Sequence, residues 1–338
     1  MSNWISAHLF YHADAFPLLT ECVTPLVAEL RAQDAIVSYF FIRYWENGPH
    51  VRLRLRPANP RRDGERIRQL VECQATDFFA KRPALYPLDA DAMQPFYKTL
   101  FIGEYGEAAY TEKYGDGPIP IDPNNSIRFI DYEPEVARYA GARGVELAEW
   151  HFEASSDIAL GMINDLNMKV RTIQLGLAFQ TLLLQSYAMW KTDERVYAFL
   201  GMYFDHWRNV VIPEKVRESR MKRFDRRYAH LAAKVKRRVS HVRSLMQGQR
   251  EPVDFEGTWL THCDALVTEL ARRVDNAELE FPDGVNSGLE KAMEYLFPSY
   301  FHMTSNRLGV SIDDEIYLTY LARRGLEAVT DGQCVASR

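Results

Sequence analysis

The sequence predicts an α+β protein, and three observations support that prediction. Near the N-terminus, short apolar and aromatic runs follow the order strand, helix, strand, strand. From residue 144 onward, apolar residues recur three or four positions apart, which is the period of a helix. The 338 residues are 47% hydrophobic and 26% charged, so the chain can bury a full core. We expect a single domain, 1–338, with a β-α-β-β sheet unit first and a helix-rich second half.

The sheet unit occupies the first part of the chain. Residues 4–12 suit a strand, and 16–31 carry leucines at helical spacing. A β-rich run at 37–45 is followed by the turn-like Glu46–Pro49 and by a strand at 50–56. These segments account for one helix and three strands.

The strand at 50–56 has one basic face, because Val51, Leu53 and Leu55 alternate with Arg52, Arg54 and Arg56. The plainest interpretation is the wet outer face of an edge strand. The alternative is a cradle for a carboxylate or a phosphate, since a guanidinium matches two oxygens at once. Arg43 and His50 stand near this row and are counted with it.

The remaining elements follow from the same patterns. A helix is expected at 61–80, and then loop with short elements to 125, where prolines and glycines are frequent. A strand is expected at 126–131, and Pro134 followed by Glu135 suits the start of a helix. The later helices are expected at 145–164, 170–190, 194–211, 215–246, 264–276, 288–296 and 313–330.

Composition excludes several classes of function. The 41 basic and 46 acidic residues give a net charge of -5, which argues against non-specific nucleic-acid binding. The four cysteines lie far apart without zinc-type spacing, so we expect no metal site and a reducing, cytoplasmic setting. The chain has neither a signal-peptide pattern at its start nor a membrane-length apolar run. It also lacks nucleotide-binding, zincin and serine-hydrolase motifs, and we expect no cofactor.

Residues 215–250 hold 13 Lys and Arg against two acidic residues. A regular apolar stripe through this segment favours a structural amphipathic helix with a wet basic face. Binding of RNA or of an acidic peptide is the alternative. We expect charge reversal there to leave turnover of an isolated substrate largely intact.

Two later residues are candidates for chemistry. Arg138 is flanked by Glu133 and Glu135 and by itself suggests a surface ion pair. His302 is followed closely by Thr304, Ser305, Asn306 and Arg307, polar groups that can fix its tautomer as a general base requires.

Four stretches of the sequence resemble the C-terminal domain of lantibiotic dehydratases, which also occurs as a stand-alone protein in thiopeptide biosynthesis. They are WISAHLFY at 4–11, FFIRYWENGPHVRLRLR at 40–56, FIDYEPEVARYAG at 129–141 and FHMTSNRLG at 301–309. The resemblance implies elimination of glutamate from glutamylated serine or threonine in a ribosomal precursor peptide, which leaves dehydroalanine or dehydrobutyrine. It also implies a separate glutamyl-tRNA-dependent glutamylation protein as a partner, with no membrane and no direct need for nucleic acid.

The family's elimination residues correspond to Arg52, Arg54, Arg138 and His302, and all four are retained. The resemblance implies that the arginines bind the glutamyl group and stabilise developing negative charge, while His302 moves the proton. Arg43, His50, Asn306 and Arg307 are expected to assist substrate binding. We expect one shared pocket, with His302 no more than ~15 Å from at least one of the two strand arginines. Ala140 departs from the family, which commonly has glycine there.

Two other functions remain open. Related stand-alone proteins join two dehydroalanines in a formal [4+2] cycloaddition, which forms the pyridine ring of thiopeptides with loss of the leader peptide. Such a protein needs no glutamate cradle, so retention of the four positions favours elimination. A non-catalytic peptide- or RNA-binding partner of a glutamylation enzyme is the third hypothesis, and it rests on residues 215–250.

Overall fold

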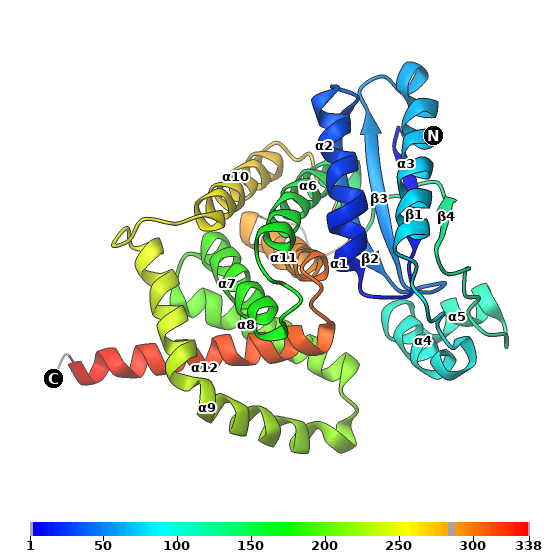
Figure 1. Ribbon diagram of the computed structural model, residues 1–338. Coiled ribbons are helices and arrows are strands. Elements are labelled where there is room, and N and C mark those ends of the chain that lie inside the picture. The colour runs from blue at the N-terminus through cyan, green and yellow to red at the C-terminus, as the bar shows by residue number, and fades with distance from the viewer. Residues whose placement is uncertain (1–2, 283–287, 337–338) are drawn as a thin grey trace. The chain divides into compact units, whose positions relative to one another are not determined.

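The computed structural model describes residues 3–282 and 288–336, without side-chain detail for residues 104 and 331–336. The chain forms two compact units (Figure 1). The first comprises Met1–Pro134 with Ser155–Leu166, and the second comprises Glu135–Ala154 with Asn167–Arg338. The α+β class is confirmed, with the strands near the N-terminus and helices dominating the rest. The single-domain expectation stays a prediction.

The first unit contains a four-stranded antiparallel sheet. Its strands are β1 (Ile5–Phe10), β2 (Ile36–Tyr44), β3 (His50–Pro57) and β4 (Ser126–Phe129), in the spatial order β2-β3-β1-β4. The expected β-α-β-β order is therefore confirmed. The arginine strand, β3, is a central strand, so the interpretation of the arginine row as an edge-strand face is wrong.

Helices cover the apolar face of this sheet (Figure 1). The predicted helix at 16–31 is present as α1 (Ala15–Leu18), the π-helical turn η1 (Leu19–Val23) and α2 (Thr24–Ala32). Helix α3 (Pro60–Lys81) begins at the N-cap Asn59, whose side chain accepts a hydrogen bond from the Arg62 amide. Beneath these helices the apolar residues of β3 are fully buried.

The segment that we expected to be mainly loop, up to residue 125, contains two helices, α4 (Ala90–Tyr105) and α5 (Glu107–Tyr114). The expectation was wrong because Pro95 is accommodated inside α4, while Gly106, with φ of 88°, separates the two helices. Four buried residues form a small core here: Tyr97, Phe101, Tyr110 and Ile119.

The expectation that a helix starts near Pro134 was also wrong. Residues 136–140 form a turn, and α6 (Gly141–Asp165) begins after it. Ala140 and Gly141 have φ of 57° and 91°, outside the right-handed helical region. The left-handed pair prevents the helix from extending back to Pro134.

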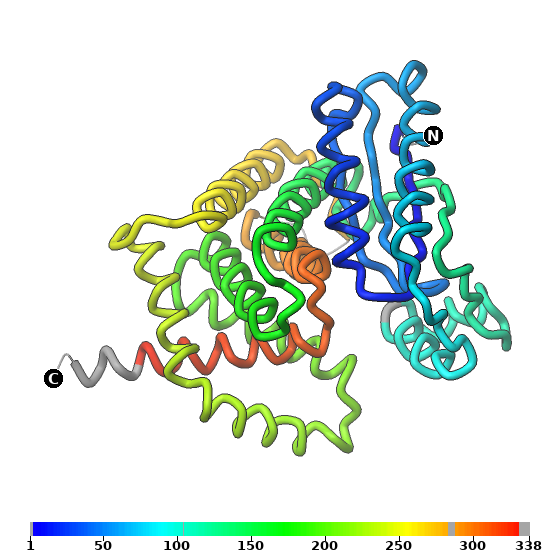
Figure 2. Tube along the Cα trace, viewed as in Figure 1, coloured from blue at the N-terminus to red at the C-terminus, as the bar shows by residue number. Residues whose placement is uncertain are grey.

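The second unit is built from helices, and α6 runs through both units. The others are α7 (Arg171–Trp190), α8 (Asp193–Val211), α9 (Glu214–Met246), α10 (Phe255–Asp275), α11 (Leu289–Arg307) and α12 (Ile312–Ala336). Helices α10 and α11 are longer than predicted, and α11 continues through Pro298 to include His302. Helix α12 packs against α8 and α9, as the chain trace shows (Figure 2).

Within the described residues, no helix is long and apolar enough to cross a membrane. The same part of the chain contains no cluster of three His, Cys, Asp or Glu residues arranged to hold a metal ion.

Candidate functional site

The arginine row of β3 lies on a largely buried face of the sheet. Arg52 is directly opposite His8 of β1, and Arg54 is opposite Ser6. Directly opposite residues of antiparallel strands point to the same face. His8, Ser6 and Arg54 are all buried, and the exposed fraction of Arg54 is only 5%. The predicted division of β3 into a basic and an apolar face is confirmed.

His50 orients Arg52. The Nδ1–H of His50 donates to the carbonyl oxygen of Gly48 at 2.8 Å, and its Nε2 accepts from Nε of Arg52 at 3.2 Å. Burial lowers the pKa of His50 to about 3, so the ring is neutral and can accept that bond. His50 therefore holds the guanidinium in place.

Arg52 already faces a carboxylate of its own unit. Its Nη2 lies 3.8 Å from Glu46, and its guanidinium stacks 3.4 Å from the centroid of the Tyr44 ring. Glu46 also accepts hydrogen bonds from Lys113 at 2.6 Å and Tyr114 at 2.5 Å. The charge of Arg52 is therefore partly neutralised within the unit.

Arg54 is in a different electrostatic situation. Its Nη1 donates to the Ser6 hydroxyl at 2.5 Å, and its guanidinium lies 5.2 Å from the centroid of the Tyr132 ring. Among the described residues, no carboxylate lies within ion-pair distance of it, and its buried Nε has no hydrogen-bond partner. Burial, reinforced by the charge of Arg52, lowers the pKa of Arg54 to about 9. A buried cation of this kind is suited to binding an anion.

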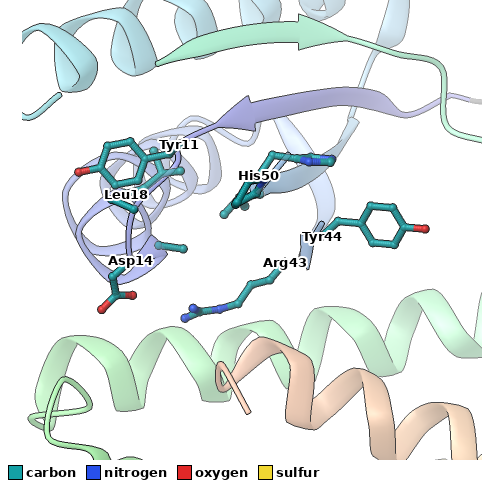
Figure 3. Close-up of a pocket in the computed structure, with 10 residues that line it drawn as sticks. Tyr11, Asp14, Leu18, Arg43, Tyr44 and His50 are labelled. Carbon is teal, nitrogen blue, oxygen red and sulfur yellow. The ribbon is translucent and has the colours of Figure 1, made fainter. Parts of the chain in front are cut away.

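Arg43 does not join the Arg52 and Arg54 row. It pairs with Val51 and so lies on the apolar face of the sheet, which corrects the grouping expected from sequence proximity. Its guanidinium lies 4.5 Å from the centroid of the Phe16 ring. Arg43, His50 and Asp14 line a cavity of about 220 Å³, in which Arg43 extends toward Asp14 (Figure 3).

In the second unit, the turn before α6 presents Arg138 to α11. Nε of Arg138 donates to the Ser299 hydroxyl at 3.1 Å, and its Nη1 lies 3.3 Å from Glu135. The Tyr295 hydroxyl donates to the carbonyl oxygen of Ala137 at 2.9 Å and anchors the turn. The expected ion pair is present, with Ser299 as an additional partner.

His302 is held by a buried carboxylate. Its Nδ1 lies 3.0 Å from Oε1 of Glu315, which is fully buried at the start of α12. A carboxylate only accepts hydrogen bonds, so Nδ1 carries the proton and Nε2 is the basic atom. The Tyr203 hydroxyl donates to Oε2 of the same glutamate. Burial and the Glu315 charge raise the pKa of Tyr203, which therefore stays protonated as that donor.

Arg138 and His302 belong to one neighbourhood. Ser299, the partner of Arg138, lies three residues before His302 and thus on the same side of α11. The positive charge of Arg138 also acts on the Tyr203 hydroxyl. This arrangement combines a cation with a histidine whose tautomer is set by a carboxylate, a combination suited to proton transfer beside developing negative charge.

The other two predicted residues extend the same helix. Asn306 lies one turn after His302 on α11. Arg307 is fully buried, donates to the Met303 carbonyl oxygen at 2.7 Å and lies 4.7 Å from the centroid of the Phe152 ring. Arg43, His50, Arg52 and Arg54 belong to the first unit, and Arg138, His302, Asn306 and Arg307 to the second. Their convergence in one pocket stays a prediction.

Glu315 and Tyr203 were not predicted from the sequence. Glu315 follows Asp313 and Asp314, so it resembles an ordinary acidic residue in the first turn of a helix. Tyr203 falls within the apolar pattern of α8. One signal could have identified Glu315: it is an acidic residue at a position where the helical pattern predicts a buried side chain.

The fold and these side chains define a member of a known family. A family model described as lantibiotic biosynthesis dehydratase C-term matches residues 4–326, so the chain belongs to this family. The resemblance inferred from the four sequence stretches is confirmed.

Three solved structures share the fold. The pyridine synthase TbtD from thiomuracin biosynthesis is 20% identical, with a TM-score of 0.76 over 97% of this chain and 99% of that one. TsrL is 15% identical, with a TM-score of 0.68 over 97% and 95%. The tRNA-dependent lantibiotic dehydratase MibB from Microbispora sp. 107891 is 14% identical, with a TM-score of 0.53 over 98% of this chain and 28% of that chain. No curated protein sequence matches this chain significantly.

Proposed function

We propose that the protein eliminates glutamate from glutamylated serine and threonine residues of a ribosomally made precursor peptide. The observation that supports this proposal best is Arg54, a buried guanidinium without a carboxylate within ion-pair distance in the described structure. A glutamyl ester supplies such a partner, because glutamate carries a second carboxylate besides the one that leaves.

The reaction has three linked changes. A base removes the Cα proton of the esterified residue, the Cα–Cβ double bond forms, and the Cβ–O bond breaks so that glutamate leaves as a carboxylate. Nε2 of His302 takes the proton, and Glu315 stabilises the resulting imidazolium through Nδ1–H. Arg138 stabilises the enolate-like intermediate, while Arg52 and Arg54 hold the glutamyl group.

The partners and the setting belong to the same proposal. The substrate is a ribosomal precursor peptide, a separate glutamyl-tRNA-dependent protein supplies the ester, and the reaction takes place in the cytoplasm. Neither a membrane nor direct contact with nucleic acid is required for elimination.

A pyridine synthase activity is the second candidate, and the comparisons support it better than they support elimination. TbtD, a pyridine synthase, matches this chain from end to end, whereas MibB matches through 28% of its length. In addition, Arg52 already faces Glu46, which reduces the charge available to a substrate glutamate. In this reaction the basic Nε2 of His302 would move protons between an amide and its imidic acid form.

One assay separates the candidates. The purified protein is incubated with a peptide that carries one glutamylated serine and, separately, with a peptide that carries two dehydroalanines after a leader segment. Loss of glutamate from the first peptide, with the second unchanged, supports elimination. Ring formation with leader loss in the second, with the first unchanged, replaces elimination by cycloaddition.

A further inference from the structure

Helix α9 (Glu214–Met246) has a buried side and a charged side. Phe224, Tyr228, Val235, Val239 and Val242 are buried, and α9 packs against α12 and α7. This confirms the apolar stripe expected from the sequence. The packing accounts for the apolar residues, but not for the concentration of cations on the opposite side.

The outer side carries a row that we call the basic stripe: Arg223, Arg226, His230, Lys234 and Arg237. These residues are all exposed and lie three or four positions apart, so they share one side of the helix. At 1.5 Å per residue the stripe is about 21 Å long. The helix supplies 12 of the 41 lysines and arginines in a chain whose net charge is -5.

Glu218 and Asp225, the two acidic residues of α9 nearest the stripe, do not neutralise it. Glu218 pairs with Lys222 at 2.6 Å, and Asp225 accepts from Tyr320 and lies 3.8 Å from Arg324. In the described part of the chain, no ion pair or side-chain hydrogen bond involves a stripe residue. The stripe therefore presents its charge to solvent.

We propose that the basic stripe of α9 docks an extended acidic segment of the substrate peptide, outside the residues that react. This inference rests on the proposed function in one respect, which is that the bound peptide is the substrate. An extended peptide presents side chains to one side about every 6.6 Å. Arg223 and Arg226, like Lys234 and Arg237, lie about 4.5 Å apart along the helix, and about 12 Å separates the two pairs. Glutamates or aspartates of an extended peptide can therefore approach each pair of cations.

A nucleic acid fits the stripe less well. Single-stranded nucleic acid is held by stacking of bases on aromatic side chains as well as by charge. Phe224 and Tyr228, the aromatic residues of α9 other than its histidines, are on the buried side. The net negative charge of the chain also opposes broad attraction of a polyanion.

Fluorescence anisotropy with fluorescein-labelled octaglutamate as the probe tests the inference on the full chain. We expect saturable binding at 50 mM NaCl that weakens with added salt. The variant R223E/R226E/R237E should raise Kd at least tenfold. The variant R223Q/R226Q/R237Q, which adds no negative charge, should raise it less but in the same direction. Circular dichroism checks that both variants keep their helix content.

The matched control is R61E/K81E/K98E, which makes the same change in net charge at exposed positions of the first unit. It should leave Kd within twofold of the unmodified protein. Three results overturn the inference: no binding of octaglutamate, equal weakening by the control, or tighter binding of a single-stranded RNA oligonucleotide than of the peptide at equal charge concentration.

A turnover measurement keeps this inference separate from the proposed function. With a short glutamylated peptide that contains no other acidic residue, R223E/R226E/R237E should release glutamate at the unmodified rate. If the unmodified protein releases no glutamate, the proposed function fails and the binding result stands. If only the stripe variant loses turnover of this short peptide while remaining folded, the stripe acts on the reacting residues and the docking inference is wrong.

Discussion

In the proposed elimination, the geometry of proton transfer depends on Glu315. It holds Nδ1–H of His302 and, through its other oxygen, the Tyr203 hydroxyl. Glu315→Gln should slow glutamate release by roughly 10²-fold or more, because the amide no longer fixes the tautomer or stabilises the imidazolium.

The matched control for this change is Glu327→Gln on the same helix, where the carboxylate is partly exposed and bonds to Tyr197. It should retain the activity of the unmodified protein. An unaltered rate of glutamate release by a folded Glu315→Gln protein would remove Glu315 from the proposed proton transfer.

Substitution of Arg54 should reduce activity without reducing stability. Arg54→Met replaces a buried cation that has no acidic partner in the described residues by an apolar side chain of similar length. Such replacements are often neutral or stabilising. We expect an unchanged or higher free energy of unfolding, but a loss of glutamate release of at least 100-fold. Arg54→Lys should also be impaired, since an ammonium lacks the planar fork.

Arg56→Met is the control for Arg54→Met, because Arg56 lies on the same face of β3 but is exposed and 5.6 Å from the centroid of the Trp4 ring. It should keep its activity. Strong destabilisation by Arg54→Met would mean that an internal partner, rather than a substrate, balances the Arg54 charge.

A functional residue could be predicted from the sequence only where it stands in a recognisable pattern or motif. Arg52 and Arg54 stand in a two-residue period, and Arg138 and His302 stand in distinctive motifs, so all four could be selected. Glu46 and Glu315 leave no such signal, because Glu46 contacts Lys113 and Glu315 contacts Tyr203, and these partners lie far away in the sequence. Arg43 was misplaced because proximity in sequence does not determine which sheet face a residue occupies.

At the scale of elements, the turn before α6 depends on Gly141. Its φ is 91°, and a Cβ added there would lie 2.9 Å from Cβ of Glu280. Gly141→Ala should lower the free energy of unfolding by about 2 kcal/mol, from backbone strain and from this contact. Urea denaturation followed by circular dichroism measures the change.

Gly161→Ala is the opposite case, because Gly161 lies inside α6 and no atom lies within 4 Å of the added Cβ. It should raise stability by about 0.5–1 kcal/mol. Equal effects of the two substitutions would contradict the assigned turn geometry.

The elements themselves were predictable where hydrophobic periodicity was unbroken. The four strands and the helices α7, α8 and α9 follow their apolar patterns within a few residues. The errors occur at proline and glycine. Pro95 falls in the segment predicted as loop, and Pro298 follows the helix predicted at 288–296. Both lie inside helices, α4 and α11, where packing outweighs the lost hydrogen bond. Pro134 was taken as a start, but the left-handed Ala140 and Gly141 prevent a helix there.

At the scale of the whole molecule, buried neutral histidines link stability to pH in both units. Burial lowers the pKa of His8 to about 2, of His50 to about 3 and of His262 to about 4. The unfolded chain takes up these protons near pH 6.5, so stability should fall as the pH drops from 6.5 toward 4. Each of these histidines contributes about 1.4 kcal/mol per pH unit.

Thermal unfolding between pH 7 and pH 4.5 checks this expectation. In that range the carboxylates of Glu269 and Glu278, whose pKa arginine contacts lower to about 2, remain ionised in the folded state. The melting temperature should therefore fall mainly because of the histidines. A melting temperature that stays level over this range would show that these rings are protonated in the folded protein.

The proposed elimination depends most on His302, which removes the Cα proton of the glutamylated residue. Its most direct test is single-turnover release of glutamate from a peptide with one glutamylated serine, measured for the unmodified protein and for His302→Ala, with circular dichroism as the folding control. We predict release with formation of dehydroalanine by the unmodified protein and a rate lower by ~10²–10⁴ for His302→Ala. Release at the unmodified rate by a folded His302→Ala protein would contradict the claim.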